Sequence, residues 1–329
     1  MARPEGDGPM TEILGSGGAA GAGGSVGAAS ASGSAGAAGA ASSAGAAAAT
    51  SGISPAPPAA WRRALRSPNL IIGALITLTV AVVTILAPVI APYDPNEMDF
   101  ANTLAPPSAQ YPLGTDQLGH GLLTVLLHGG RVDLSVALLA AATPFVVGVL
   151  LGTVAGYVGG PLDRVIARIT DTVVAFPFYV LVIAIVAMVG QGTVGIVVTF
   201  AIVGWIGYAR VVRTATRAVA TSDYVVAARG GGLGHARVLL RHVLPATITQ
   251  AVVLLVSEIV LIMVAIVTLG FLGLGYDPSI PEWGAMIDAG RPFLTDKWWM
   301  SVAPGGAVVL VGVGLSLLAD GLSDLWGQR

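Results

Sequence analysis

Few residues of this sequence could carry covalent or metal chemistry. The chain holds no cysteine, which excludes disulfides, thiolate metal ligands and cysteine nucleophiles. Its four histidines, His120, His128, His235 and His242, show neither the HExxH spacing nor any comparable metal-binding spacing. The glycine run 230–234 lacks the Lys-Ser/Thr pair and the preceding buried strand of a phosphate-binding loop. We therefore expect no catalytic residue, and no cofactor or metal bound by this chain.

One carboxylate, Glu258, lies in the middle of a long apolar segment, 246–269, where a charge is costly and by default indicates function. Glu258 could line a translocation path or attract the cationic end of a substrate. It could equally be a protonated or hydrogen-bonded side chain at a helix interface. A single carboxylate is too little for a proton relay or an ion-coupled site, which argues against a secondary transporter.

The remaining candidate is one polar run, 223–245, with the sequence DYVVAARGGGLGHARVLLRHVLP. An apolar segment of membrane length lies on each side of it. Arg210, Arg213 and Arg217 lead into the run and three more arginines lie within it, which places it on the positive, cytoplasmic side of a membrane. The run could be a solvated loop or a docking element that receives force from a soluble motor. Its length and its small and apolar residues favour the docking element.

Local signals predict that this run folds as two short helices. Ser222 or Asp223 can cap the first helix, the glycine triplet 230–232 ends it, and residues 236–242 can form the second. Small residues such as Ala227 permit the surface of another protein to approach closely. A helix–glycine–helix unit of this kind can transmit rigid-body motion to the segments on either side.

Composition defines the surroundings of this run as membrane helices. Of the 329 residues, 54% are hydrophobic and 10% are charged, against about 25% charged residues in a soluble domain. The net charge of −2 carries no information about partners, because the charges are segregated along the chain. The first dozen residues are not followed by the apolar stretch of a secretory signal peptide.

We predict an all-α membrane protein with six transmembrane helices and both termini in the cytoplasm. The six apolar segments are 70–91, 132–157, 177–189, 194–211, 246–269 and 302–318. In this topology only Arg131, Arg291 and Lys297, of 16 basic residues, lie outside, as the positive-inside rule requires.

The segments between these helices carry signals of their own. Residues 117–128 have the apolar spacing of a short helix along the membrane surface, with Thr115 or Asp116 as its N-cap. Residues 159–176 predict an amphipathic helix on the inner side. The second span has small-xxx-small spacing that favours close helix packing over a gating hinge, at Gly148, Gly152 and Gly156.

The chain divides into a tail, a first helix and a core. Residues 1–60 are mostly Gly, Ala and Ser and cannot bury enough apolar surface to offset the entropy of ordering. We expect them to form a disordered cytoplasmic tail, dispensable rather than partner-binding. Residues 61–131 hold the first transmembrane helix and an outer loop, and residues 132–329 form a five-helix core that includes the cytoplasmic helix at 223–245.

The run 223–245 resembles the EAA motif of the permease subunits of binding-protein-dependent ABC importers. That motif reads Glu-Ala-Ala, three residues, Gly and then a Leu-Pro ending. Ala227 and Ala228 match its alanines, Gly232 its glycine, and Leu244 and Pro245 its end.

One position departs from the motif, because Val226 stands where the family has its glutamate. Docking would therefore rest on shape and on Arg229, Arg237 and Arg241, rather than on an ion pair from that glutamate. The resemblance implies a set of ATPase-coupling residues: Asp223, Tyr224, Val226, Ala227, Ala228, Arg229, Gly232, Arg237, Arg241, His242, Leu244 and Pro245.

The resemblance extends from about Pro68 to Arg329 and is to the dipeptide/oligopeptide/nickel branch, in particular to its C-type subunit. It is carried by APVIAPYDP, PLGTDQLG, AGYVGG, DTVVAFP, GWIGYARVVR, FLGLG, EWGAMI and DGLSD. Two further departures are His120-Gly121, where relatives have Arg-Asp, and Ile266, where relatives often have an acidic residue.

The resemblance implies a type I ABC importer permease fold in the plasma (inner) membrane, surrounded by lipid and binding no nucleic acid. The chain would form half of a channel, with a second permease subunit, two ATPase subunits that hold ATP and Mg²⁺, and an extracytoplasmic substrate-binding protein. The outer segments 111–131 and 273–300 would face the binding protein. Dipeptides or oligopeptides are the expected cargo, with nickel or a glutathione-like solute as the alternative. A stand-alone secondary transporter and a non-transporting scaffold or receptor are the other hypotheses.

Overall fold

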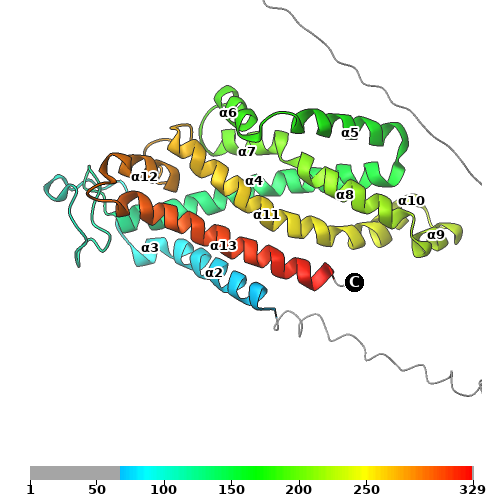
Figure 1. Cartoon of the computed structure of the whole chain (residues 1–329), viewed down its shortest axis with the longest axis horizontal. Helices are drawn as coiled ribbons and strands as arrows, with labels where there is room; N and C mark the ends of the chain where they lie inside the picture. The colour runs from blue at the N-terminus through cyan, green and yellow to red at the C-terminus, as the bar shows by residue number, and fades with distance from the viewer. Residues whose placement is uncertain (1–66, 328–329) are drawn as a thin grey trace, which may run out of the picture. The chain divides into compact units, whose positions relative to one another are not determined.

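A computed structural model describes residues 67–327, which are almost entirely helical and contain no strand (Figure 1). The predicted tail, residues 1–60, and the basic residues expected just before the first span lie outside the described range. The α-helices are α2 (Pro68–Ile85), α3 (Ala87–Ile90), α4 (Leu122–Val158), α5 (Gly160–Val174), α6 (Phe178–Val189), α7 (Gly192–Val203), α8 (Trp205–Ala220), α9 (Asp223–Gly230), α10 (His235–Val238), α11 (Leu244–Phe271), α12 (Trp283–Gly290) and α13 (Trp299–Gly327). Short 3₁₀ segments, Phe100–Asn102 and Arg291–Phe293, and a π-helical turn, Leu239–Val243, complete the set.

Five helical stretches within 67–327 are long and apolar enough to cross a membrane: Pro68–Ile85, Leu122–Val158, Gly192–Ala220, His235–Phe271 and Trp299–Trp326. A sixth is reached if α5 and α6 count as one span, and these two helices meet at 92°. The all-α membrane fold is confirmed.

The third predicted span, 177–189, corresponds only to α6, which has 12 residues. At 1.5 Å per residue α6 is about 18 Å long, shorter than the ~30 Å core of a bilayer. The bend arises at Pro177, because proline lacks an amide hydrogen and disfavours helical backbone in the residue before it. The predicted segment 177–189 is thus observed as a helix, and it reaches the length of a span only together with α5.

The predicted surface helix at 117–128 is absent as a separate element. Instead α4 begins at Leu122, with Gly121 at the N-cap position, and continues through the predicted second span. Thr115 accepts a hydrogen bond from the amide of Ala105, 2.8 Å away, and Asp116 accepts hydrogen bonds within its own turn. Neither side chain caps a helix, so this prediction was wrong.

Three glycines of α4 form its contact with α8. A Cβ atom added at Gly148, Gly152 or Gly156 would overlap backbone or Cβ atoms of α8, from Trp205 to Thr216. The two helix backbones therefore touch with no side chains between them. The packing interpretation of these glycines is confirmed.

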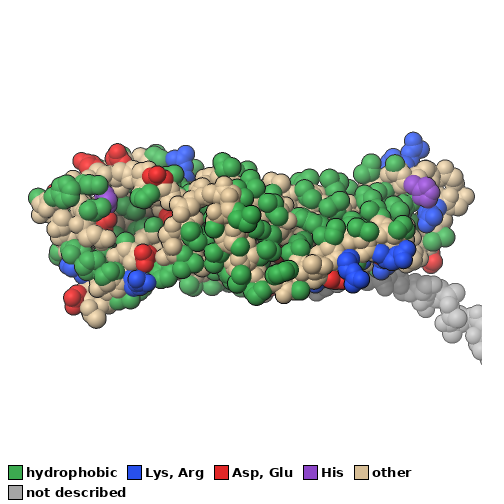
Figure 2. All heavy atoms as spheres, turned by 90° about the horizontal axis from the view of Figure 1, so that it is seen from above, with side chains coloured by type: hydrophobic (Ala, Val, Ile, Leu, Met, Phe, Trp, Pro, Cys, Tyr) green, Lys and Arg blue, Asp and Glu red, His purple; other side chains and the backbone are tan. Residues whose placement is uncertain are grey.

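The apolar surface follows the pattern of a membrane protein. A large buried cluster joins α4, α6, α7, α11, α12 and α13 and includes the fully buried Phe200, Ile262 and Trp283. Outside this cluster, long apolar side chains such as Leu75 of α2 are exposed. Figure 2 shows hydrophobic side chains over the middle of the visible face and charged side chains gathered toward its two ends.

Candidate functional site

The predicted docking run forms a small helical hairpin at one end of the long helices, here called the α9–α10 hairpin and comprising residues 223–243 (Figure 1). Val225, Val238 and Val243 are fully buried and pack together. Ala228 and Leu233 cover this cluster in part. The hairpin therefore has a core of its own, which gives it a fixed shape.

The turn between α9 and α10 needs glycine at one position. Gly232 has φ +86°, in the left-handed region where residues with a side chain are strained. A Cβ at Gly232 would meet no atom within 4 Å. Backbone conformation, rather than packing within this chain, therefore explains the glycine that matches the motif.

The hairpin differs from the local predictions in two details. Ser222 occupies the N-cap position of α9, but its hydroxyl donates to the carbonyl of Val219 at 2.6 Å and does not cap the helix. Asp223 lies in the first turn, where a negative charge is favoured by the helix dipole. The second helix starts at His235 and passes through the π-helical turn directly into α11.

Most residues of the predicted coupling set point away from this chain. The exposed members are Asp223, Tyr224, Val226, Ala227, Arg229, Gly232, Arg237, Arg241 and Pro245, and the partly buried members are Ala228, His242 and Leu244. Tyr224 and Val226 are 50% and 54% exposed, which is unusual for large apolar side chains on such a polar run. Val226, at the position of the motif's glutamate, therefore presents an exposed apolar side chain.

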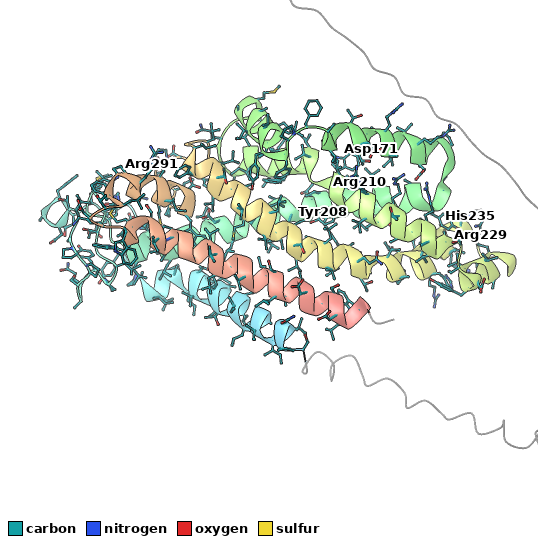
Figure 3. All side chains as sticks on the ribbon, in the orientation of Figure 1. Asp171, Tyr208, Arg210, Arg229, His235 and Arg291 are labelled. Atoms are coloured by element: carbon teal, nitrogen blue, oxygen red, sulfur yellow. The ribbon has the colours of Figure 1, made fainter. Side chains whose placement is uncertain are left out.

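Tyr157, near the end of α4, ties the hairpin to the long helices, and sequence reasoning missed it. Its hydroxyl lies 3.1 Å from Nδ1 of His235, and its ring packs edge-on against the imidazole. The guanidinium carbon of Arg229 lies 5.9 Å from the centre of the same ring. Figure 3 shows Arg229 and His235 together at this end of the molecule. An aromatic residue just before the Gly159-Gly160 pair was the available signal.

The arginines that precede the hairpin bind α5. Arg213 and Arg217 both pair with the buried carboxylate of Asp163, and the Arg213 contact is 3.0 Å long. Arg210 pairs with Asp171 at 2.8 Å. Figure 3 labels both residues, on α8 and α5. By contrast, within residues 67–327 no salt bridge involves the three hairpin arginines, Arg229, Arg237 and Arg241.

Glu258, the carboxylate expected at membrane depth, lies in the middle of α11 and is partly buried. A Cβ added at Gly207 of α8 would lie 3.2 Å from its Oε1 atom. The carboxyl group therefore points at α8. This placement favours the interface interpretation of Glu258 over the translocation path.

The predicted outer segment 111–131 contributes to a pocket of about 590 Å³ with residues 90–99. Its lining includes Asp94, Glu97, Asp99 and the aromatic rings of Tyr93 and Tyr111. The Tyr111 hydroxyl donates to Asp99 at 2.9 Å, and hydrogen bonds from Asn102 and from this hydroxyl lower the pKa of the Asp99 carboxyl. The pocket is therefore negatively charged at neutral pH.

These features define a helical membrane protein of several spans, with a small exposed hairpin at one end. Within residues 67–327, no three or more His, Asp or Glu side chains form a cluster that could hold a metal ion. Residues 148–329 match the family described as binding-protein-dependent transport system inner membrane component. Residues 59–107 match the N-terminal TM domain of oligopeptide transport permease C.

Curated relatives agree with this match. The chain is 34% identical to the di/tripeptide transport system permease protein of Pseudomonas aeruginosa, over 80% of this chain and 89% of that protein. It is 34% identical to a glutathione transport system permease protein of Pectobacterium atrosepticum, over 80% of this chain and 88% of that protein. It is 36% identical to a probable D,D-dipeptide transport system permease protein of Escherichia coli, over 79% of this chain and 87% of that protein.

The chain therefore belongs to the inner-membrane permease family of binding-protein-dependent ABC importers, and within it to the dipeptide/oligopeptide branch. It is a membrane protein, in agreement with its long apolar helices, and its relatives place it in the peptide-transport type.

Proposed function

We propose that this chain forms half of the channel of an ATP-driven importer of short peptides and that the α9–α10 hairpin docks on cytoplasmic ATPase subunits. The observation that carries the proposal is the exposed face of α9 on a hairpin with its own buried core. The matching relatives are named for dipeptides or for glutathione, which supports a short-peptide cargo over nickel.

The hairpin is suited to receive and pass on force. α9 has eight residues, about 12 Å of helix, and its outer side presents Tyr224, Val226 and Ala227. A groove that accepts this face would contact one aromatic ring, one branched side chain and a methyl group. Arg229 and Arg237, which form no salt bridge among residues 67–327, would meet acidic residues of the groove. Because the π-helical turn joins α10 to α11 without a loop, displacement of the hairpin moves α11 directly.

The remaining partners follow from the proposed assembly. A second permease subunit would complete the channel, and an extracytoplasmic binding protein would deliver the cargo. ATP and Mg²⁺ would bind only to the two ATPase subunits. The acidic pocket formed by residues 90–99 and 109–124 lies in the segment expected to face the binding protein.

The docking role is tested with Ala227→Asp, which places a charge on the exposed face of α9. The matched control is Ala218→Asp, an exposed alanine of α8 outside the hairpin. We expect Ala227→Asp to insert normally but to lose the ATPase subunits during co-purification, and uptake of a labelled dipeptide to fall at least about tenfold, a cost of about 1.4 kcal/mol or more in the docked state. Ala218→Asp should retain both.

Retention of the ATPase subunits and of full uptake in Ala227→Asp would refute docking through this face. The same uptake assay, run with excess glutathione or Ni²⁺ as competitor, distinguishes the cargo classes. We expect glutathione or unlabelled dipeptide to compete, and Ni²⁺ to leave uptake unchanged.

A further inference from the structure

A second polar cluster lies where α4 meets α12 and the turn after α11, at the opposite end of α4 from the hairpin (Figure 1). Asp133 of α4 is completely buried, and Glu282, just before α12, is 3% exposed. The amide of Trp283 donates to Oδ2 of Asp133 at 2.9 Å, which brings the two acidic residues together. Tyr276, in the turn after α11, is also buried.

Each of these three side chains keeps one buried polar atom without a partner: Oδ1 of Asp133, Oε2 of Glu282 and the hydroxyl of Tyr276. Leaving such atoms unsatisfied in an apolar site is costly, more so for a charged carboxylate. No salt bridge joins either carboxyl to a basic side chain among residues 67–327. No basic side chain of the described residues therefore compensates the two acids.

The space for the Glu282 carboxyl is formed by glycines from different elements. A Cβ added at Gly270 of α11, or at Gly275 in the turn, would overlap the carboxyl oxygens. A Cβ at Gly129 of α4 would lie 3.2 Å from Cα of Glu282. The backbone of Tyr276 supplies a hydrogen bond to the carboxyl. The pocket is thus shaped around this one side chain.

The groups that face Glu282 are few. α4 contributes Asp133, and the turn after α11 contributes Tyr276. The adjoining halves of α11 and α13, residues 259–271 and 299–313, contain no titratable side chain. His128, also on α4, does not serve as a partner of Glu282, because its ring is hydrogen-bonded to the carbonyl of Thr124.

We propose that Asp133 and Glu282 form a buried proton-binding site in which one bound proton holds the turn between α11 and α12 against α4. Two carboxyl groups in one apolar site cannot both ionise without strong repulsion. With one proton present, the site holds a single negative charge instead of two, which lowers the cost of burying both carboxyl groups. Loss of the proton leaves two like charges in the site and pushes α12 away from α4. This site does not depend on the docking role of the α9–α10 hairpin.

The direction of the pH effect follows from Glu282. Burial raises the pKa of its carboxyl from 4.5 to about 7. The folded state therefore binds this proton more tightly than the unfolded state does, so the stability that this proton contributes is greatest below about pH 4.5 and falls as the pH rises through 7. We expect the turn to be held firmly in mildly acidic surroundings and released in alkaline ones.

The test measures the melting temperature of the full chain in detergent between pH 6 and pH 8, for the wild type, Glu282→Gln and Asp288→Asn. The glutamine side chain of the first variant resembles the protonated carboxyl, whereas Asp288 is a half-exposed acid on α12. We expect the wild-type melting temperature to fall by about 3 to 6 °C across this range. Glu282→Gln should abolish most of that fall, and Asp288→Asn should retain it.

A fall in Glu282→Gln equal to that of the wild type overturns the proposal. Asp133→Asn provides a second variant, and its slope should also flatten. A bound cation would give a different result: at pH 8 and constant ionic strength, Na⁺ or K⁺ would stabilise the wild type but not Glu282→Gln. That outcome would also overturn the proton site.

Discussion

At the scale of single residues, Tyr157 connects two parts of the molecule that the chain separates by 78 positions. Its hydroxyl reaches His235, its ring lies under Arg229, and its backbone belongs to α4. One side chain thus supplies a hydrogen bond and a cation–π contact to both helices of the hairpin. The hairpin is held to α4 by this contact as well as by its chain connections to α8 and α11.

Tyr157→Phe removes the hydrogen bond and keeps the ring. We expect amide hydrogens of residues 223–238 to exchange about fivefold faster, because a neutral hydrogen bond contributes about 1 kcal/mol. Hydrogen-exchange mass spectrometry measures this. In a His235→Ala background the same substitution should have no further effect, since its partner is already gone. An equal effect in both backgrounds would contradict the pairing.

Residue-scale prediction from sequence is possible where the signal is local. The motif resemblance places Ala227, Ala228 and Gly232 within one short run, and their docking role stays a prediction. Tyr157 and the Asp133–Glu282 pair were missed because their partners lie far along the chain, 150 positions apart for Asp133 and Trp283. No local pattern marks such contacts, which arise only when the helices pack.

At the scale of elements, salt bridges between aspartates of α5 and arginines of α8 join these two helices. Asp163 is buried and holds two arginines, whereas Asp171 and Arg210 are 67% and 43% exposed. The arginines of α8 that precede the hairpin thus hold α5 against α8, in addition to indicating the cytoplasmic side of the membrane. The amphipathic helix predicted at 159–176 is confirmed, and its acids account for its position.

We expect Asp163→Asn to destabilise the protein by about 3 kcal/mol, since it leaves Arg213 partly buried without its partner. Asp171→Asn is the control, because an exposed pair contributes under about 1 kcal/mol. The two melting temperatures in detergent measure the difference. Similar losses in the two variants would show that burial of Asp163 does not strengthen its pairs.

Element boundaries could be predicted only in part. Apolar length identified α2, α11 and α13, because about 20 apolar residues suffice for a span. It failed at 117–128, which was predicted to be a separate helix along the membrane surface but is continuous with α4 through Gly129 and Gly130. These glycines continue α4 instead because Trp283 and Glu282 pack onto them, a contact that lies outside any local window.

At the scale of the whole molecule, charge and hydropathy predict which end faces the cytoplasm. The hairpin end carries the arginines of α8, α9 and α10, and the α12 end carries an acidic loop. The positive-inside rule assigns the hairpin end to the cytoplasm. This orientation is a prediction from sequence, and the absence of cysteine makes it simple to test.

Single cysteines at Ala109→Cys and Thr221→Cys provide the test, since both positions are exposed. Ala109 lies in the loop before α4, and Thr221 lies between α8 and α9, next to the hairpin. A membrane-impermeant maleimide added to intact cells should label Ala109→Cys and not Thr221→Cys. Thr221→Cys should react after the membrane is permeabilised. The reverse pattern would invert the topology and would rule out docking of the hairpin on a cytoplasmic ATPase.

The glycine stripe of α4 has a mechanical consequence. Backbones in direct contact at Gly148, Gly152 and Gly156 hold α4 against α8 along about 12 Å, because neither helix can slide without a clash. Tyr157, which contacts the hairpin, lies one residue beyond the last of these glycines. A displacement of the hairpin would therefore carry these parts of α4 and α8 together as one rigid body.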